Sequence, residues 1–178
     1  MADARVVDTN VLIVASAADN ASAFDPGATP VDDPMLRQQV LDWLQGFESD
    51  PDIHLVVDFG WLVFEEYQRK LTSQDYGLLA ILNKHDRNEI VWVELQVDRD
   101  GHAVLPSELE EAVTDLADRK MVAAVLAANE EAPTCRLTNA CDTDWLDCGD
   151  AIAAHGVSVE HLIEEWLRRK WREKRGAK

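Results

Sequence analysis

The sequence predicts an α/β fold of three layers, in which helices cover both faces of a mostly parallel sheet of four or five strands. Short apolar, often β-branched runs alternate along the chain with longer segments of helical periodicity. Such alternation is typical of βαβ units, whose crossovers place successive strands parallel. The 178 residues suit one globular domain. No stretch approaches the roughly 18 apolar residues that a membrane span needs.

The first half of the chain contains two strand–helix units. In order, we expect a strand over 5–7, helices over 11–17 and 34–47, a strand over 53–57, and helices over 61–71 and 73–84. Each strand stops at an aspartate, Asp8 or Asp58, and Asp58 is a plausible N-cap for the helix that follows. Pro34 suits the first turn of its helix. The segment 18–34 is rich in Asp, Asn, Ser, Gly and Pro, which predicts a surface loop.

The second half continues this pattern. We expect a strand over 90–97, a turn at 98–101, a helical tract over 107–129, a strand over 135–138, a short helix over 147–154, a strand over 156–159 and a helix from about residue 158 into the tail. Ser107 and Glu110 have the spacing of a capping box at the start of the helical tract. A break in that tract is expected near Thr114.

Charge is divided unevenly between the body and the C-terminus. The chain has 17 Lys and Arg against 34 Asp and Glu, a net charge of −17. Seven Lys or Arg and one Glu fall within residues 168–178, so this tail carries +6 and the rest of the chain −23. We therefore divide the chain into a domain over 1–160 and a C-terminal helix with a basic tail over 161–178.

The acidic body would repel a nucleic acid unless cations are recruited locally. The tail supplies candidate RNA contacts at Arg168, Arg169, Lys170 and Arg172, and Trp166 or Trp171 offers a stacking face. The alternative is a solvated helix end whose positive charge suits the helix dipole.

Cysteine usage and the N-terminus indicate the compartment. Cys135, Cys141 and Cys148 are not spaced as C-x-x-C pairs, and no histidine stands at zinc-ligand distance. The N-terminus lacks the basic and apolar regions of a secretory signal. We expect reduced thiols, a cytoplasmic protein and no membrane partner.

Acidic residues are expected to gather at one edge of the sheet. Asp8 follows the first strand, while Asp142 and Asp144 follow the fourth, and sites in such sheets lie outside the carboxyl ends of the strands. Asp118 precedes three apolar residues at spacings of three, four and seven, which predicts a half-buried carboxylate on a buried helix face. The helix after the second strand adds Glu65 or Glu66. Each acid taken alone is more ordinarily a turn, cap or solvated residue.

A cluster of four carboxylates is stable at neutral pH only with shared protons or a bound cation. Oxygen-only ligands suit Mg²⁺ or Mn²⁺. Such ions activate water for phosphodiester hydrolysis, so no serine, cysteine or histidine nucleophile is required.

Each of four segments places one of these acids within a distinct pattern of neighbouring residues. Residues 6–13 hold an acid that ends a strand, then Thr-Asn and an apolar helix; residues 64–71 hold a glutamate before an aromatic residue; residues 118–127 open with an acid; residues 137–145 hold Thr-Asn, Asp-x-Asp and an aromatic residue. In this order they resemble the PIN domain family of metal-dependent ribonucleases over residues 5 to 145. The glutamate before the aromatic residue is Glu66, which this resemblance favours over Glu65.

The resemblance implies a metal site built from Asp8, Glu66, Asp118 and Asp142 around one or two Mg²⁺ or Mn²⁺ ions, with Asp144 as an accessory ligand. The last motif departs from the family pattern. The family commonly has an acid where Ala140 stands, two residues after the threonine, so Asp142 and Asp144 take the usual places only if the loop is longer by two. Which of the two is the main ligand stays open.

Two accessory roles and a reaction are implied in the same way. Asn10 would orient Asp8 or the attacking water, and Thr138 would hydrogen-bond the carboxylates. The implied reaction is endonucleolytic hydrolysis of single-stranded RNA. Many family members are toxins neutralised by a small antitoxin and are dimers, so an antitoxin and a second copy of the chain are expected partners.

Two other classes of function stay open. A PIN-like domain that no longer cuts RNA would be a binding or assembly module, which the shifted last motif and the acidic surface favour. A different metal-dependent phosphoryl hydrolase would act on small phosphates. Against an aspartyl-phosphate phosphatase, Asn10 stands where such enzymes have a second aspartate. Metal binding and activity on RNA distinguish these classes.

Overall fold

The computed structural model describes residues 3–131 and 134–177 and has one all-parallel sheet at its centre. The strands are β1 (Asp3–Val7), β2 (Ile53–Asp58), β3 (Ile90–Val93), β4 (Cys135–Asn139) and β5 (Val159–His161). Their order across the sheet is β3-β2-β1-β4-β5, and each neighbouring pair is parallel. The predicted α/β class with a parallel sheet is confirmed.

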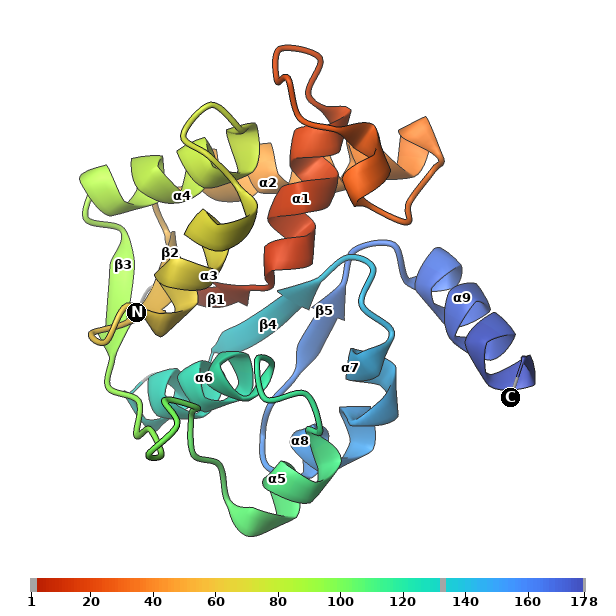
Figure 1. Ribbon diagram of the computed structural model, residues 1–178. Coiled ribbons are helices and arrows are strands. Elements are labelled where there is room, and N and C mark those ends of the chain that lie inside the picture. Colours follow the sequence, from red (N-terminus) through yellow and green to blue (C-terminus); the bar gives the residue numbers. More distant parts are fainter. Residues whose placement is uncertain (1–2, 132–133, 178) are drawn as a thin grey trace.

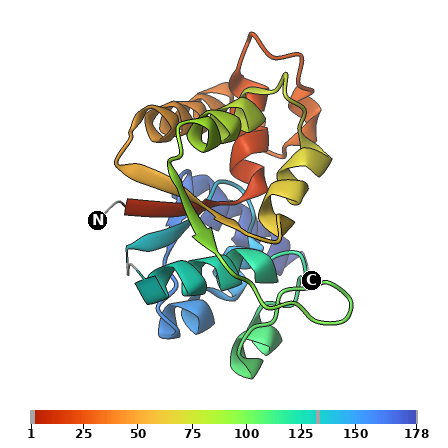
Figure 2. The same ribbon diagram turned by 90° about the vertical axis from the view of Figure 1, so that its left-hand side faces the viewer.

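Helices cover both faces of this sheet, which gives three layers (Figure 1). One face carries α1 (Thr9–Ala18), α2 (Pro34–Ser49), α3 (Leu62–Lys70) and α4 (Tyr76–Asp86). The other carries α5 (Ser107–Ala112), α6 (Arg119–Glu131), α7 (Asp144–Asp147) and α8 (Gly149–Ala154). A short 3₁₀ turn, η1 (Pro26–Ala28), lies in the loop after α1, and α9 (Glu164–Gly176) lies beyond β5. Figure 2 shows the same layers with the edge strand β3 toward the viewer.

The central strands bury neighbouring residues on both faces, because both faces of the sheet are covered. Val6 and Val7 of β1 are fully buried, as are Val56 of β2 and Leu137 of β4. The last helix joins the same core, since Trp166 and Leu167 are buried in it. The boundary drawn at residue 160 stays a prediction.

The strand order places a crevice next to β1. The chain passes from β1 outward to β3 and then returns to the other side of β1 as β4. Ligands of open α/β sheets bind at such a switch point, outside the carboxyl ends of the two strands. Val7 pairs with Thr138, so β1 and β4 end side by side and Asp8 and the loop after Asn139 share this edge.

Several predicted boundaries were wrong. Strand β3 ends at Val93 rather than at residue 97, because Val97 instead forms an antiparallel bridge with Ala103 across a turn in which Gly101 has a φ of 84°. β5 is Val159–His161 rather than 156–159, and the last helix begins at Glu164.

The predicted break in the tract over 107–129 is confirmed, since α5 ends at Ala112 and α6 begins at Arg119. The predicted capping box is wrong. Pro106 is the N-cap residue of α5, no side chain caps the helix, and Glu110 accepts a hydrogen bond from the amide of Leu105.

None of the helices in the described part of the chain is both long and apolar enough to span a membrane.

Candidate metal centre

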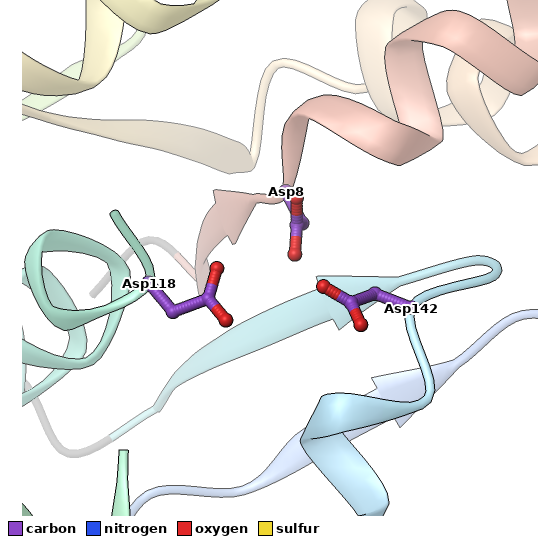
Figure 3. Close-up of side chains that lie close together, drawn as sticks. All are labelled: Asp8, Asp118 and Asp142. Carbon is purple, nitrogen blue, oxygen red and sulfur yellow. The ribbon is translucent and has the colours of Figure 1, made fainter. Parts of the chain in front are cut away.

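Three aspartates from separate parts of the chain converge at the switch point. Asp8, Asp118 and Asp142 each offer a carboxylate oxygen, and these oxygens lie within 4.8 Å of one another. Figure 3 shows the three side chains pointing toward a common centre from the end of β1, the start of α6 and the loop after β4. We call these residues the aspartate trio. The sheet edge thus brings together residues that are 110 and 24 positions apart in sequence.

Asp8 is held by groups on both sides of it. Its backbone amide donates to Thr138 O over 3.0 Å, which continues the β1–β4 pairing. Its carboxylate caps α1, accepting from the Asn10 amide over 3.3 Å, and accepts from the indole Nε1 of Trp145 over 2.6 Å. Asp8 is buried, and Trp145 is 1% exposed. This leaves Asp8 little freedom of orientation.

Asp118 lies immediately before α6, not inside it as the sequence analysis predicted. Its carbonyl accepts hydrogen bonds from the amides of Met121 and Val122, so it sits at the first turn. The carboxylate is half-buried, as predicted. Asp8 likewise precedes α1, so two of the three carboxylates lie at the positive end of a helix, which favours negative charge.

The loop that carries Asp142 is fixed by two asparagines. Asn10 Oδ1 accepts from the amides of Ala140 and Cys141 over 2.9 and 3.1 Å, and Asn10 Nδ2 donates to Asn139 Oδ1 over 3.0 Å. Asn139, which is fully buried, donates to the Asp142 carbonyl and accepts from the Asp142 amide. The start of α1 and the loop after β4 are therefore tied together.

Burial and mutual repulsion perturb all three carboxylates. Burial raises the pKa of Asp8 to about 7, with Asp142 and Glu66 adding to the rise and the Trp145 hydrogen bond opposing it. Burial, followed by the charges of Asp8 and Asp142, raises the pKa of Asp118 to about 8. The pKa of Asp142 is also raised, chiefly by burial. Within residues 3–131 and 134–177, no Lys or Arg forms an ion pair with any of the three.

A divalent cation fits this arrangement. Buried like charges without a counter-ion are costly, and a metal ion reverses the local pKa shifts by favouring the ionised carboxylates. The donor set is all oxygen, which suits hard cations. The trio can therefore hold a metal ion.

The structure does not place Glu66 in the trio. Its Oε1 accepts from Thr9 Oγ1 over 2.8 Å, and its carboxylate forms an ion pair with Lys120. Glu66 thus borders the trio, as its effect on the pKa of Asp8 indicates, but its charge is paired with that of Lys120. Glu65 is exposed and pairs with Arg69 over 3.7 Å. Of the two glutamates, Glu66 is the one that lies beside the centre.

Asp142, not Asp144, converges with the other two aspartates. The Asp144 carboxylate pairs with Lys174 over 3.2 Å, while its amide donates to Asp142 Oδ1 over 2.9 Å. Asp144 therefore orients Asp142 through its backbone, and its side chain points to a lysine.

Of the two predicted accessory contacts, that of the Thr138 hydroxyl is wrong, and that of Asn10 with Asp8 is made by the backbone amide. The Thr138 hydroxyl donates to Glu160 over 3.3 Å rather than to the aspartates, because the side chain alternates away from them and only its carbonyl contacts Asp8. The Asn10 side chain holds the loop after β4, and only the Asn10 amide bonds Asp8.

The C-terminal cations have different partners. Arg168 pairs with Glu164 over 2.7 Å and Arg169 with Glu173 over 4.0 Å, both within α9. Lys174, in contrast, reaches Thr143 Oγ1 over 3.1 Å and Asp144, and Trp171 Nε1 donates to Asp147 over 2.8 Å. The basic helix is thus docked on the acidic segment after β4.

Sequence reasoning missed two residues of this site. Both residues belong to the motif over 137–145, in which Asn139 follows Thr138 and Trp145 is the last residue, but the motif alone assigned neither of them a role. The signal that assigns them a role is spatial: a buried indole N–H needs an acceptor, and a buried amide side chain needs several partners.

A scan against protein-family models, a search of the curated proteins and a search of the solved structures found no match to this chain.

Proposed function

We propose that this chain is a Mg²⁺- or Mn²⁺-dependent endoribonuclease of the PIN-like type, with Asp8, Asp118 and Asp142 as the metal ligands. The observation that carries the proposal is the convergence of three carboxylates at the switch point of the sheet, with no ion pair to any Lys or Arg that the structure describes. When bound, a divalent cation supplies Lewis acidity toward a phosphodiester oxygen and activates water.

Other chemistries have less support at this edge. Burial raises the pKa of the nearby thiols of Cys141 and Cys148 to about 12 and about 11, so neither is a thiolate nucleophile at neutral pH. The turn after β1 reads Asp8-Thr9-Asn10 and has no glycine, so it lacks the backbone cradle that holds the pyrophosphate of a dinucleotide. Metal-assisted hydrolysis of a phosphate ester remains the reaction that these groups support best.

Several residues of the chain would orient the metal ligands. Trp145 and the Asn10 amide hold the Asp8 carboxylate in one orientation, and Asn139 holds the loop that presents Asp142. The Glu66–Lys120 pair lies next to them with a hydroxyl partner, Thr9, on its inner side. Preorganisation of this kind is what makes charged groups effective in a site. The choice of RNA over other phosphate esters rests on the resemblance of the four motifs.

The test is cleavage of labelled single-stranded RNA by the purified protein, with Mn²⁺, with Mg²⁺ and with a chelator. We expect metal-dependent internal cleavage that Asp8→Asn and Asp118→Asn each reduce by at least about 100-fold, since metal-ligand losses exceed the 10–100-fold typical of outer-shell changes. Asp42→Asn, which changes an exposed aspartate on α2, is the matched control and leaves cleavage unchanged. Thermal melts show that the variants fold.

Two outcomes of these experiments would favour a different function. Absence of Mn²⁺ and Mg²⁺ binding to the wild-type chain would favour a PIN-like binding or assembly module. Hydrolysis of nucleotides or sugar phosphates without cleavage of RNA would favour a different phosphoryl hydrolase. The proposed toxin role is a separate step: growth arrest on expression that Asp8→Asn abolishes would support it, and an antitoxin would be sought as the product of a short open reading frame beside the gene.

A further inference from the structure

An open pocket of about 500 Å³ lies between α9 and the loop after β4. Its walls include Asp142 and Thr143 from that loop, Pro30 from the segment before α2, and Trp166, Lys170 and Lys174 from α9. The pocket therefore shares one residue, Asp142, with the aspartate trio. It adjoins the candidate metal centre from the side of the C-terminal helix.

Two ammonium groups line this pocket. Lys174 Nζ donates to Oγ1 of Thr143, the residue after Asp142, over 3.1 Å. Lys170 lies one turn earlier on α9, with its Nζ 5.9 Å from the centre of the Trp166 ring. The buried Trp166 ring forms a wall of the pocket beneath Lys170.

Both lysines pair with exposed carboxylates, which a phosphate group can displace. Lys170 pairs with Glu173 over 3.2 Å and Lys174 with Asp144 over 3.2 Å. Both pairs are solvent-exposed, and such pairs contribute only about 0–1 kcal/mol. Hydrogen bonds from an ammonium group to phosphate oxygens are charge-assisted in the same way, so exchange of a carboxylate for a phosphate group costs little.

The charge of the pocket depends on the metal centre. Lys170 and Lys174 line the pocket together with Asp142 and Glu173, and Lys174 also pairs with Asp144, so the acidic charges are not outweighed when all of these groups are ionised. A divalent cation on the trio would offset two of its three negative charges and would so weaken the repulsion that Asp142 exerts on an anion in the pocket. In a chain of net charge −17, this gives a phosphate group a favourable position next to the candidate metal centre.

From this geometry we propose that the pocket between α9 and the loop after β4 binds a phosphate group of the single-stranded RNA substrate, with Lys170 and Lys174 as its anion-binding residues. The inference rests on the proposed function and makes it specific. It also narrows the RNA contacts predicted from sequence. Lys170 and Lys174 line this pocket, whereas Arg168, Arg169 and Arg172 do not.

The test is equilibrium binding of a labelled, 2′-O-methylated RNA that cannot be cleaved, measured with Mn²⁺ at several salt concentrations. Lys170→Gln and Lys174→Gln are compared, singly and together, with Arg169→Gln and Arg172→Gln, which remove the same charge from exposed positions on the same helix. We expect the double lysine variant to lose at least about 10-fold in affinity. The slope of log affinity against log salt should fall by about 1.4, the value for two lost contacts to a single strand. The double arginine control should lose less than about 2-fold.

A separate Mn²⁺ titration of the same variants distinguishes this inference from the proposed function. Retained Mn²⁺ affinity with weakened RNA binding supports the pocket. Equal losses in the lysine and arginine pairs would overturn it in favour of diffuse charge, as would unchanged RNA affinity. Loss of Mn²⁺ affinity together with RNA affinity in both Lys174→Gln and Lys170→Gln would also overturn it, because α9 would then act only by placing the Asp142 loop. A wild-type chain that binds Mn²⁺ but no RNA rejects the pocket and leaves the metal centre standing.

Discussion

The acidic residues around the start of α1 form two groups with different surroundings. Asp8, Asp118 and Asp142 face one another with no basic partner in the described structure, and burial raises the pKa of each. Glu66 and Asp144, which border them, each have a lysine, Lys120 or Lys174.

The contrast shows that the chain does not lack cations near this edge of the sheet. Two lysines lie on the flanks of this region, and each forms its ion pair with a neighbouring acid rather than with an aspartate of the trio. Buried carboxylates are ordinarily paired or bind a metal ion. That the trio has no ion pair within the described ranges is therefore more informative than the number of acids, of which the chain has 34.

The largest effect that this comparison predicts is on metal affinity. Asp118→Asn and Asp142→Asn should each weaken Mn²⁺ binding by more than about 100-fold, because each removes a charged ligand. Asp144→Asn should weaken it by less than about 10-fold, because the side chain faces Lys174 and the orienting contact to Asp142 comes from the backbone amide. Isothermal titration calorimetry at pH 8 measures all three. Similar losses in the three variants would mean that the two groups of acids do not differ in function.

The second prediction concerns stability in the absence of metal. The pKa of Asp8 is about 7 in the folded chain against 3.8 for an ordinary aspartate, so between these values the folded state holds a proton that the unfolded state has released. The free energy of unfolding should therefore fall as the pH rises from about 4 to about 7, and change little from this group above pH 8. Asp118, with a pKa of about 8, acts in the same direction.

Denaturant unfolding with a chelator at pH 5.5 and pH 8.5 measures this effect. The loss of stability between the two should be smaller in Asp8→Asn than in the wild-type chain by about 2 kcal/mol, the linkage value for this shift. The asparagine keeps a side-chain oxygen that can accept the hydrogen bond from Trp145. The Asp144→Asn control should lose stability as the wild-type chain does. An identical pH dependence in Asp8→Asn would show that Asp8 titrates normally and that the trio needs no cation.

Much of the fold was predictable because local signals agree with the tertiary structure. The strands that became β1 and β2 contain consecutive buried apolar residues, Val6-Val7 and Leu55-Val56-Val57, each followed by an aspartate. β4 has a shorter signal, since only Leu137 is apolar between Arg136 and Thr138. The edge strands β3 and β5 gave weaker signals and wrong bounds. Their ends are set by a turn and a loop, at Val97 and before Glu164, rather than by the hydrophobic pattern.

The candidate site was predictable in part for a related reason. Asp8 and Asp142 follow strands whose carboxyl ends share an edge, so parallel topology alone brings them near each other. The partner of Glu66 was not predictable, since Lys120 is 54 residues away and meets it only through the contact of α3 with α6. The Thr138 hydroxyl was placed wrongly because strand alternation directs it to Glu160.

Glu66 gives the smallest predicted effect and the sharpest test of the boundary between the two groups. Because its charge is already balanced by Lys120, Glu66→Gln should weaken Mn²⁺ binding by less than about 10-fold, the lower end for residues outside the ligand set. Glu65→Gln, the matched control on the exposed side of the same helix, should leave Mn²⁺ affinity unchanged. A Glu66→Gln loss as large as that of Asp118→Asn would contradict the division. Glu66 would then leave Lys120 when the ion binds, and the four-acid centre that the sequence motifs imply would be the functional one.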